Sequence, residues 1–110
     1  MGYIAHEAVI ASTYGEEQRE RIECFRELLP VKWRGSLVGP IPAQTNGDDF
    51  WAFMPDGSKE GWPTSDVGEG LRDEFVGLLR HMRVDFVSVR FGGDYGMEFG
   101  ANVVAHGDES

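Results

Sequence analysis

Cysteine is almost missing from this chain of 110 residues, and Cys24 is its single example. One cysteine cannot form an internal disulfide, so the sequence predicts a fold held by an apolar core in a reducing compartment such as the cytoplasm. The neighbours Glu23 and Glu27 are acidic, whereas an activated thiolate needs an electropositive setting. We therefore interpret Cys24 as a small packing residue and not as a nucleophile.

Long apolar runs and basic charge are also scarce. No apolar stretch approaches the roughly 20 residues that span a bilayer, and the N-terminus lacks a signal-peptide pattern. Ten Lys and Arg stand against nineteen Asp and Glu, which gives a formal net charge of −9. Such a chain repels the phosphates of nucleic acids and of anionic lipids. The composition predicts a soluble cytoplasmic protein without a direct nucleic-acid or membrane partner.

Catalytic and metal-binding patterns are absent as well. The histidines His6, His81 and His106 are far apart, and none is spaced with another His or Cys as zinc ligands are. No nucleophile stands beside a base. The acidic pair Asp48-Asp49 is better interpreted as the solvated shoulder of a hairpin than as two carboxylates in different environments. The sequence therefore predicts a non-enzymatic protein without a cofactor or a metal ion.

The first third of the chain contains a strand pattern followed by a helix pattern. Residues 3–12 are apolar on both faces, which is typical of a central strand. Thr13 and Glu16 have the spacing of a capping box, so a helix is predicted to begin there and to end at Pro30. The apolar stripe of this helix consists of Ile22, Phe25, Leu28 and Leu29.

The middle of the chain predicts two strands of unequal quality. Two prolines between residues 31 and 44 cannot donate to a sheet ladder, so this segment forms at best an edge strand. Asn46-Gly47 predicts a tight turn, and residues 49–54 after it are the best strand candidate in the chain. Alternation along that strand places Trp51 and Phe50 on opposite faces.

The last part of the chain predicts its clearest helix and a closing hairpin. A cap at Ser65 or Asp66 precedes one stripe of apolar residues at helical spacing, namely Val67, Leu71, Phe75, Leu78, Leu79 and Met82. Residues 84–91 and 97–105 then alternate as two strands. Residues 106–110 are interpreted as a flexible tail.

The resulting order β-α-β-β-α-β-β predicts a single domain of the α+β class. We expect a two-layer sandwich in which two helices cover one face of a mostly antiparallel sheet, arranged as a ferredoxin-like βαββαβ unit with an extra C-terminal strand. The other face of the sheet is then expected to expose aromatic residues, and such a face usually meets a second copy or a ligand. The sequence thus predicts a homo-oligomer, most simply a dimer.

The loop MPDGSKEGWPTSD, residues 54–66, is the best candidate for a binding site. It offers hydrogen-bond donors and a tryptophan stacking face, a combination that suits a ligand with a ring and an anionic group. Acidic residues already occupy the N-terminal field of the following helix, so basic side chains must hold the anion. We expect the ligand site to consist of Ser58, Lys59, Trp62, Arg34 and Arg90. In the alternative interpretation, Trp62 is only a structural plug over the sheet edge.

Several short motifs, spread over nearly the whole chain, carry a family resemblance. They are MGYIAHEAVI at the start, Asn46-Gly47, Phe53, Pro55 to Trp62, Ser65-Asp66, Phe75, Gly93-Asp94 and His106 to Glu109. With these motifs the chain resembles a group of small proteins encoded by phages of actinobacteria, and PDGSKEGW is the most specific of them. The resemblance implies a protein acting in the host bacterial cytoplasm. It supplies no catalytic residues, and it implies binding because most small phage proteins bind host factors, imitate DNA or sequester nucleotide signals.

Two binding functions follow from these residues and from the resemblance. The first is to sequester a small nucleotide-like signal of a host defence system through the predicted ligand site. The second is an acidic inhibitor or DNA mimic that binds a host protein through its carboxylates, Asp48, Asp49, Asp56, Glu60, Asp66, Glu69, Asp73 and Glu74. The first is favoured because it uses both the loop and the uncovered sheet face. A small hydrolase is a weaker third reading, since a nucleophile–base pair is lacking.

Overall fold

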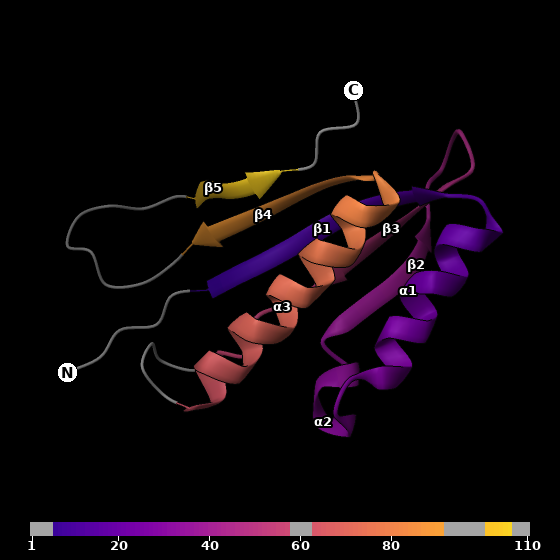
Figure 1. Ribbon diagram of the computed structural model, residues 1–110. Helices are drawn as coiled ribbons and strands as arrows, with labels where there is room; N and C mark the ends of the chain where they lie inside the picture. Colours follow the sequence, from indigo (N-terminus) through magenta and orange to yellow (C-terminus); the bar gives the residue numbers. More distant parts are fainter. Residues whose placement is uncertain (1–5, 58–62, 92–100, 107–110) are drawn as a thin grey trace.

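Strands and helices follow one another in the order that the apolar periodicity predicts, with one additional short helix. The computed structural model describes residues 6–57, 63–91 and 101–106 (Figure 1). Its elements are β1 (His6–Tyr14), α1 (Glu16–Leu28), α2 (Val31–Arg34), β2 (Leu37–Pro42), β3 (Asp48–Phe53), α3 (Pro63–Met82), β4 (Asp85–Phe91) and β5 (Ala101–His106). The predicted α+β class with an antiparallel sheet is confirmed. No helix in the described ranges is long and apolar enough to cross a membrane.

The strands form one antiparallel sheet with the order β2-β3-β1-β4-β5. β1 is central, because Val9 lies opposite Phe53 of β3 on one side and opposite Ser88 of β4 on the other. Val9 and Ala11 on the side facing the helices are buried, whereas Ile10 on the other side is 46% exposed, so β1 is apolar on both faces although helices cover only one. β2 lies at the edge of the sheet, and its register shifts between Val38 and Ile41, where the chain contains a proline that cannot donate. The predictions of a central first strand and a proline-containing edge strand are confirmed.

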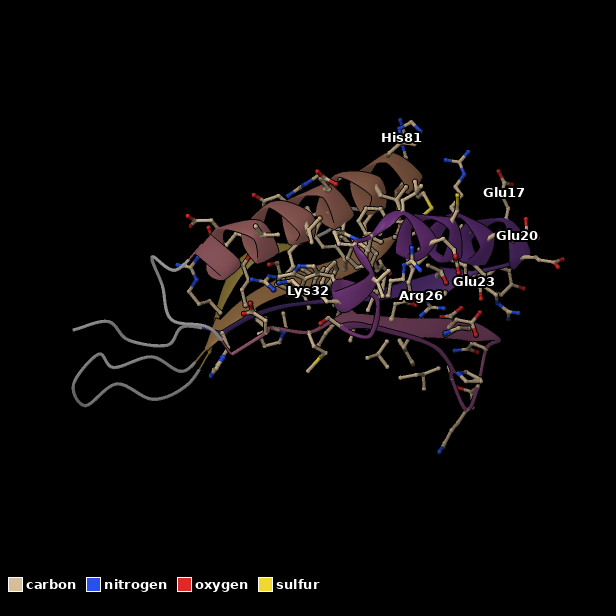
Figure 2. All side chains as sticks on the ribbon, turned by 90° about the horizontal axis from the view of Figure 1, so that it is seen from below. Glu17, Glu20, Glu23, Arg26, Lys32 and His81 are labelled. Atoms are coloured by element: carbon tan, nitrogen blue, oxygen red, sulfur yellow. The ribbon has the colours of Figure 1, made fainter. Side chains whose placement is uncertain are left out.

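Helices α1 and α3 lie side by side on one face of the sheet (Figures 1 and 2). Between them and the strands is the core, in which the ring of Phe75 lies 5.4 Å from that of Phe25 and 5.7 Å from that of Phe53, centroid to centroid. Trp51 and Phe53 point into this core and are inaccessible to solvent, whereas Phe50 points to the other face. Burial of each such large side chain stabilises the fold by about 1.5–3 kcal/mol.

The predicted capping box at the start of α1 is wrong. Thr13 lies within β1, and its Oγ1 accepts a hydrogen bond of 2.9 Å from Nε1 of the buried Trp51. The residue before the helix is Gly15, with φ +93°, which has no side chain with which to cap the helix. A buried indole N–H without an acceptor is costly, so the hydroxyl serves the core and not the helix. The backbone N–H of Tyr14 instead donates to Oε1 of Gln18, at 2.8 Å.

The described residues form three helices and not the predicted two. The additional helix, α2, lies in the segment that the sequence marks as poorly patterned, and its Trp33 is buried. Helix α3 begins at Pro63, ahead of the predicted cap at Ser65 or Asp66, which agrees with the preference of proline for the first helical position.

The predicted packing role of Cys24 is also wrong, because its side chain is exposed on α1. Leu28, a member of the predicted apolar stripe, is exposed as well, at 80% of its surface. The other three members of the predicted stripe are confirmed, because Ile22 is buried, Phe25 packs against the core, and Leu29 is buried just after the helix ends. The sequence pattern therefore identified the helix but assigned two residues of its outer side to the core.

Candidate functional site

The five residues of the predicted ligand site are distributed over different parts of the fold. Ser58, Lys59 and Trp62 lie outside the described residues. Arg34, in α2, donates from Nε to the carbonyl oxygen of Leu29 at 3.0 Å and from Nη2 to that of Glu27 at 2.9 Å. It therefore supplies partners for carbonyl groups at the end of α1.

Arg90 occupies β4 and belongs to a different set of contacts. Its Nη2 lies 3.4 Å from Oε1 of Glu7, whose Oε2 accepts a hydrogen bond of 3.1 Å from the hydroxyl of Ser88. Figure 1 shows α2 and β4 on opposite sides of α3, so the structure does not bring Arg34 and Arg90 together. Both guanidinium groups contribute to internal contacts.

Sequence reasoning missed another arginine, Arg72, which lies on the inner side of α3. Residues 68, 72, 75 and 79 of this helix are buried, at spacings of four, three and four. Only 4% of the surface of Arg72 is accessible to solvent. Its Nε and Nη1 are buried, and neither makes a hydrogen bond in the part of the chain that the structure describes. The side chain therefore places a permanent positive charge inside the sandwich.

Trp33 and Arg72 both lie close to Gly68 of α3. A Cβ atom on Gly68 would lie 2.9 Å from Cη2 and 3.3 Å from Cζ3 of Trp33, and 3.3 Å from Nη2 of Arg72. Because ring and guanidinium approach the same point on α3, they are close neighbours, and only glycine leaves room for both. We call the group of Arg72, Trp33 and Gly68 the Arg72 site.

The other arginines that face the sandwich have partners, and this makes Arg72 exceptional. Arg19 forms an ion pair of 3.0 Å with the buried Asp49. Arg26 donates from Nη1 to the carbonyl oxygens of Leu37 and Gly39 at 3.0 and 2.9 Å. A buried ion without such partners destabilises a fold by several kcal/mol. A guanidinium group can bind an anion through two parallel hydrogen bonds, so the Arg72 site is a candidate for anion binding.

The sequence contained a signal for Arg72 that the stripe prediction overlooked. Val67, the first residue of that stripe, is 48% exposed, whereas Gly68 directly after it is buried. A helix face centred one residue later passes through Gly68, Arg72, Phe75 and Leu79. A charged residue in the middle of a buried face is rare and usually has a partner, so Arg72 could have been identified as a candidate.

The carboxylates of the acidic-inhibitor hypothesis fall into two groups. Asp49 is buried against Arg19, so its prediction as a solvated residue is wrong. Of the other residues, Asp48 and Glu69 are half-buried, Glu60 lies outside the described residues, and Asp56, Asp66, Asp73 and Glu74 are exposed. Figure 2 also shows Glu17 and Glu20 projecting outward from α1. The outer surface of the helical layer is thus rich in negative charge.

Two polar hollows lie near the other end of α3. One, of about 270 Å³, is lined by Glu17, Gln18, Arg21, His81 and Met82. The second, of about 240 Å³, lies beside Gln18 and is lined in part by Asp48, Arg83 and Asp85. Within the described ranges, no group of three or more His, Cys, Asp or Glu is placed to hold a metal ion. Charges of both signs line each hollow, so neither has the uncompensated charge of the Arg72 site.

Comparisons of the chain with protein-family models, with curated proteins and with solved structures find no match. Function must therefore be inferred from the contacts of the chain itself. Among these, the buried Nε and Nη1 of Arg72, which have no hydrogen-bond partner in the described part of the chain, are the feature that the contacts between the described residues do not account for.

Proposed function

We propose that this protein binds and sequesters a small anionic ligand of the nucleotide class and does not catalyse a reaction on it. The observation that carries the proposal is the buried guanidinium group of Arg72, whose Nε and Nη1 have no partner among the described residues. A buried charge lowers the stability of the free protein. Such a loss is typical of sites that are kept for function, where a ligand supplies the missing interaction.

The chemistry of the Arg72 site favours a phosphate-bearing ligand with a ring. Arginine matches phosphate and carboxylate oxygens in a planar, two-pronged geometry. The indole of Trp33 lies beside it, and aromatic rings bind nucleobases by stacking. The predicted residues Ser58, Lys59 and Trp62 directly precede α3, and Arg72 follows the first residue of that helix by nine positions, or roughly 13 Å along its axis. The proposal therefore joins the predicted loop and Arg72 in one binding region.

The charge of the chain is compatible with a small anion but not with an anionic polymer. A net charge of −9 repels a long polyphosphate backbone over its whole length. A single small anion instead experiences mainly the local field of Arg72, because water and salt screen charges more than about 10 Å away. This difference supports a free nucleotide or a related phosphate compound as the ligand.

We also propose that the fold is ferredoxin-like and that the protein acts in a host bacterial cytoplasm. The element order and the strand order β2-β3-β1-β4, with β5 added beside β4, support the assignment of the fold. The resemblance of the motifs to small actinobacteriophage proteins supports the cellular setting. In that setting the ligand is a signal nucleotide of a host defence system.

Calorimetric titration with a panel of phosphate compounds tests the proposed function. The panel consists of inorganic phosphate, pyrophosphate, AMP, ADP and cyclic mono- and dinucleotides. The parent protein is expected to bind at least one of them, and Arg72→Met is expected to lose this binding. Arg80→Met is the matched control, because Arg80 is an exposed arginine of the same helix whose guanidinium lies 5.3 Å from the ring centroid of Phe86. Absence of binding by the parent, or equal binding by Arg72→Met, would refute the proposal.

A second function, inhibition of a basic host protein, is supported by the carboxylates on the outer surface of the helices. Asp73 and Glu74 on α3, and Glu17 and Glu20 on α1, are exposed. Association through these groups is expected to weaken steeply with added salt, because exposed charges are screened. A parent protein that binds no phosphate compound but captures a host protein in a salt-sensitive way would favour this second function.

A further inference from the structure

The sheet has an open face, opposite α1 and α3, on which large apolar side chains are exposed (Figure 2). Five of them, each between 41% and 48% exposed, define this open face: Ile10, Val38, Ile41, Phe50 and Met54. Ile41 lies opposite Phe50, and Ile10 and Val38 both lie opposite Ala52 from the two sides of β3. The five side chains are therefore neighbours and not isolated surface residues. Contiguous apolar patches larger than a few hundred Å² usually mark interaction sites.

Charge is excluded from the middle of the open face. Side chains alternate between the two faces along each strand, and this places four more uncharged residues of β1, β3 and β4 on the open face: Ala8, Ala52, Val87 and Val89. The described acidic residues of this side, Asp48 and Asp85, lie at one end, opposite Tyr14 and Ser12. In a chain with a net charge of −9, the described middle of the open face, over β1 to β4, is thus free of charged side chains.

We infer that the open face is covered by a second copy of this chain, packed sheet against sheet in a symmetric dimer. A partner for this surface must be flat, apolar and uncharged, and the same face of another copy has these three properties. Contact through it keeps the acidic helical layers of the two copies apart, which limits their repulsion. Face-to-face sheets pack about 10 Å apart, and a stable dimer needs about 800 Å² from each partner. The apolar patch extends over β2, β3 and β1, from one edge of the five-stranded sheet to its central strand, and is therefore the surface that the second copy is expected to cover.

This dimer is independent of the proposed ligand function. Arg72 is buried on the inner side of α3, and α3 covers the sheet face opposite the open face (Figure 2). Each copy therefore keeps its own Arg72 site. Failure of the dimer leaves the ligand proposal standing, and failure of ligand binding leaves the dimer standing.

Sedimentation and light scattering over a range of micromolar concentrations test the inference. The parent is expected to have twice the 12.3 kDa mass of one chain. Phe50→Lys and Ile10→Lys each place a charge in the interface and are expected to reduce the mass to that of a monomer. Leu28→Lys and Val31→Lys are matched controls, because these residues are 80% and 76% exposed but lie outside the open face. The controls are expected to remain dimeric.

Circular dichroism must confirm that each lysine variant is folded. If Phe50→Lys is unfolded, Val38→Lys at the edge strand β2 takes its place, since a partly exposed edge position tolerates lysine. A parent that stays at 12.3 kDa at every concentration overturns the inference. A folded Phe50→Lys or Val38→Lys variant that remains dimeric also overturns the inference. Dissociation of the Leu28→Lys control would overturn it as well.

Discussion

Replacement of Arg72 by methionine should stabilise the ligand-free protein. Methionine retains much of the length and apolar surface of the arginine side chain but removes its charge and its donors. Only 4% of the surface of Arg72 is accessible to solvent, and two of its nitrogens have no partner among the described residues. Replacing buried ionic groups by apolar residues of similar volume is neutral or stabilises proteins by about 1–4 kcal/mol. We expect a gain within this range, which raises Tm by several degrees.

Urea unfolding of parent and variant, followed by circular dichroism, measures this change. The midpoint should increase at an unchanged slope, because the surface exposed on unfolding stays nearly the same. A saturating ligand should reverse the order of stabilities. At a hundred times its Kd, a ligand stabilises the parent by about 2.7 kcal/mol, whereas a variant that does not bind it gains nothing.

The opposite sign would refute this reasoning. Removing one partner of a buried ion pair usually destabilises a protein by about 3–5 kcal/mol, because the other charge is left unpaired. A loss of that size in Arg72→Met would show that Arg72 has a partner within the chain and is structural. Arg80→Met, which changes an exposed arginine of the same helix, should lower stability by no more than about 1 kcal/mol, the contribution of its contact with the ring of Phe86.

Three further predictions concern single residues. Gly68→Ala should destabilise the protein by about 1–3 kcal/mol in a thermal melt, because the new Cβ would lie 2.9 Å from an indole carbon. Gly77→Ala, in open space on the same helix, should instead stabilise it by up to about 1 kcal/mol, and equal effects of the two changes would contradict the close approach. Thr13→Val should lower stability to urea by about 1–3 kcal/mol, since the N–H of Trp51 loses its acceptor; an unchanged midpoint would argue against that bond. Cys24 should react with a thiol reagent as completely in the native as in the unfolded protein, and protection until unfolding would show that it is buried.

The apolar periodicity was sufficient to predict the sequence of elements. Alternation correctly separated Trp51 and Phe53 from Phe50, because side chains of a strand leave on alternate faces whatever lies around it. Asn46 and Gly47 both have φ near +74°, as the predicted tight turn requires. Such features depend on neighbouring residues, so they can be inferred from a short segment.

Features that depend on distant partners were not predictable in this way. Thr13 has the spacing of a helix cap, but its partner Trp51 is 38 positions away. Asp49 stands in an acidic pair beside a turn, but Arg19, 30 positions earlier, draws it into the sandwich. In each case a tertiary contact prevailed over the local pattern.

The candidate site shows the same limit. Arg34 and Arg90 were selected for their charge, and the structure engages them with Glu27, Leu29 and Glu7. The importance of Arg72 depends on which side of α3 is buried. Leu71 packs against the core as predicted, but Val67, the first residue of the predicted stripe, is exposed, and the buried face begins at Gly68 instead. The loop that contains Ser58, Lys59 and Trp62 stays a sequence-based prediction.

Nitrogen NMR of the arginine side chains tests most directly whether Arg72 binds a phosphate compound. The Nε–H signal that is absent from Arg72→Lys identifies Arg72, and the one absent from Arg80→Lys provides an internal control. Addition of the nucleotide or phosphate compound that binds in calorimetry should shift the Arg72 signal and leave the Arg80 signal in place. An Arg72 signal that stays unchanged at saturation, with every compound of the panel, would contradict the proposed ligand site.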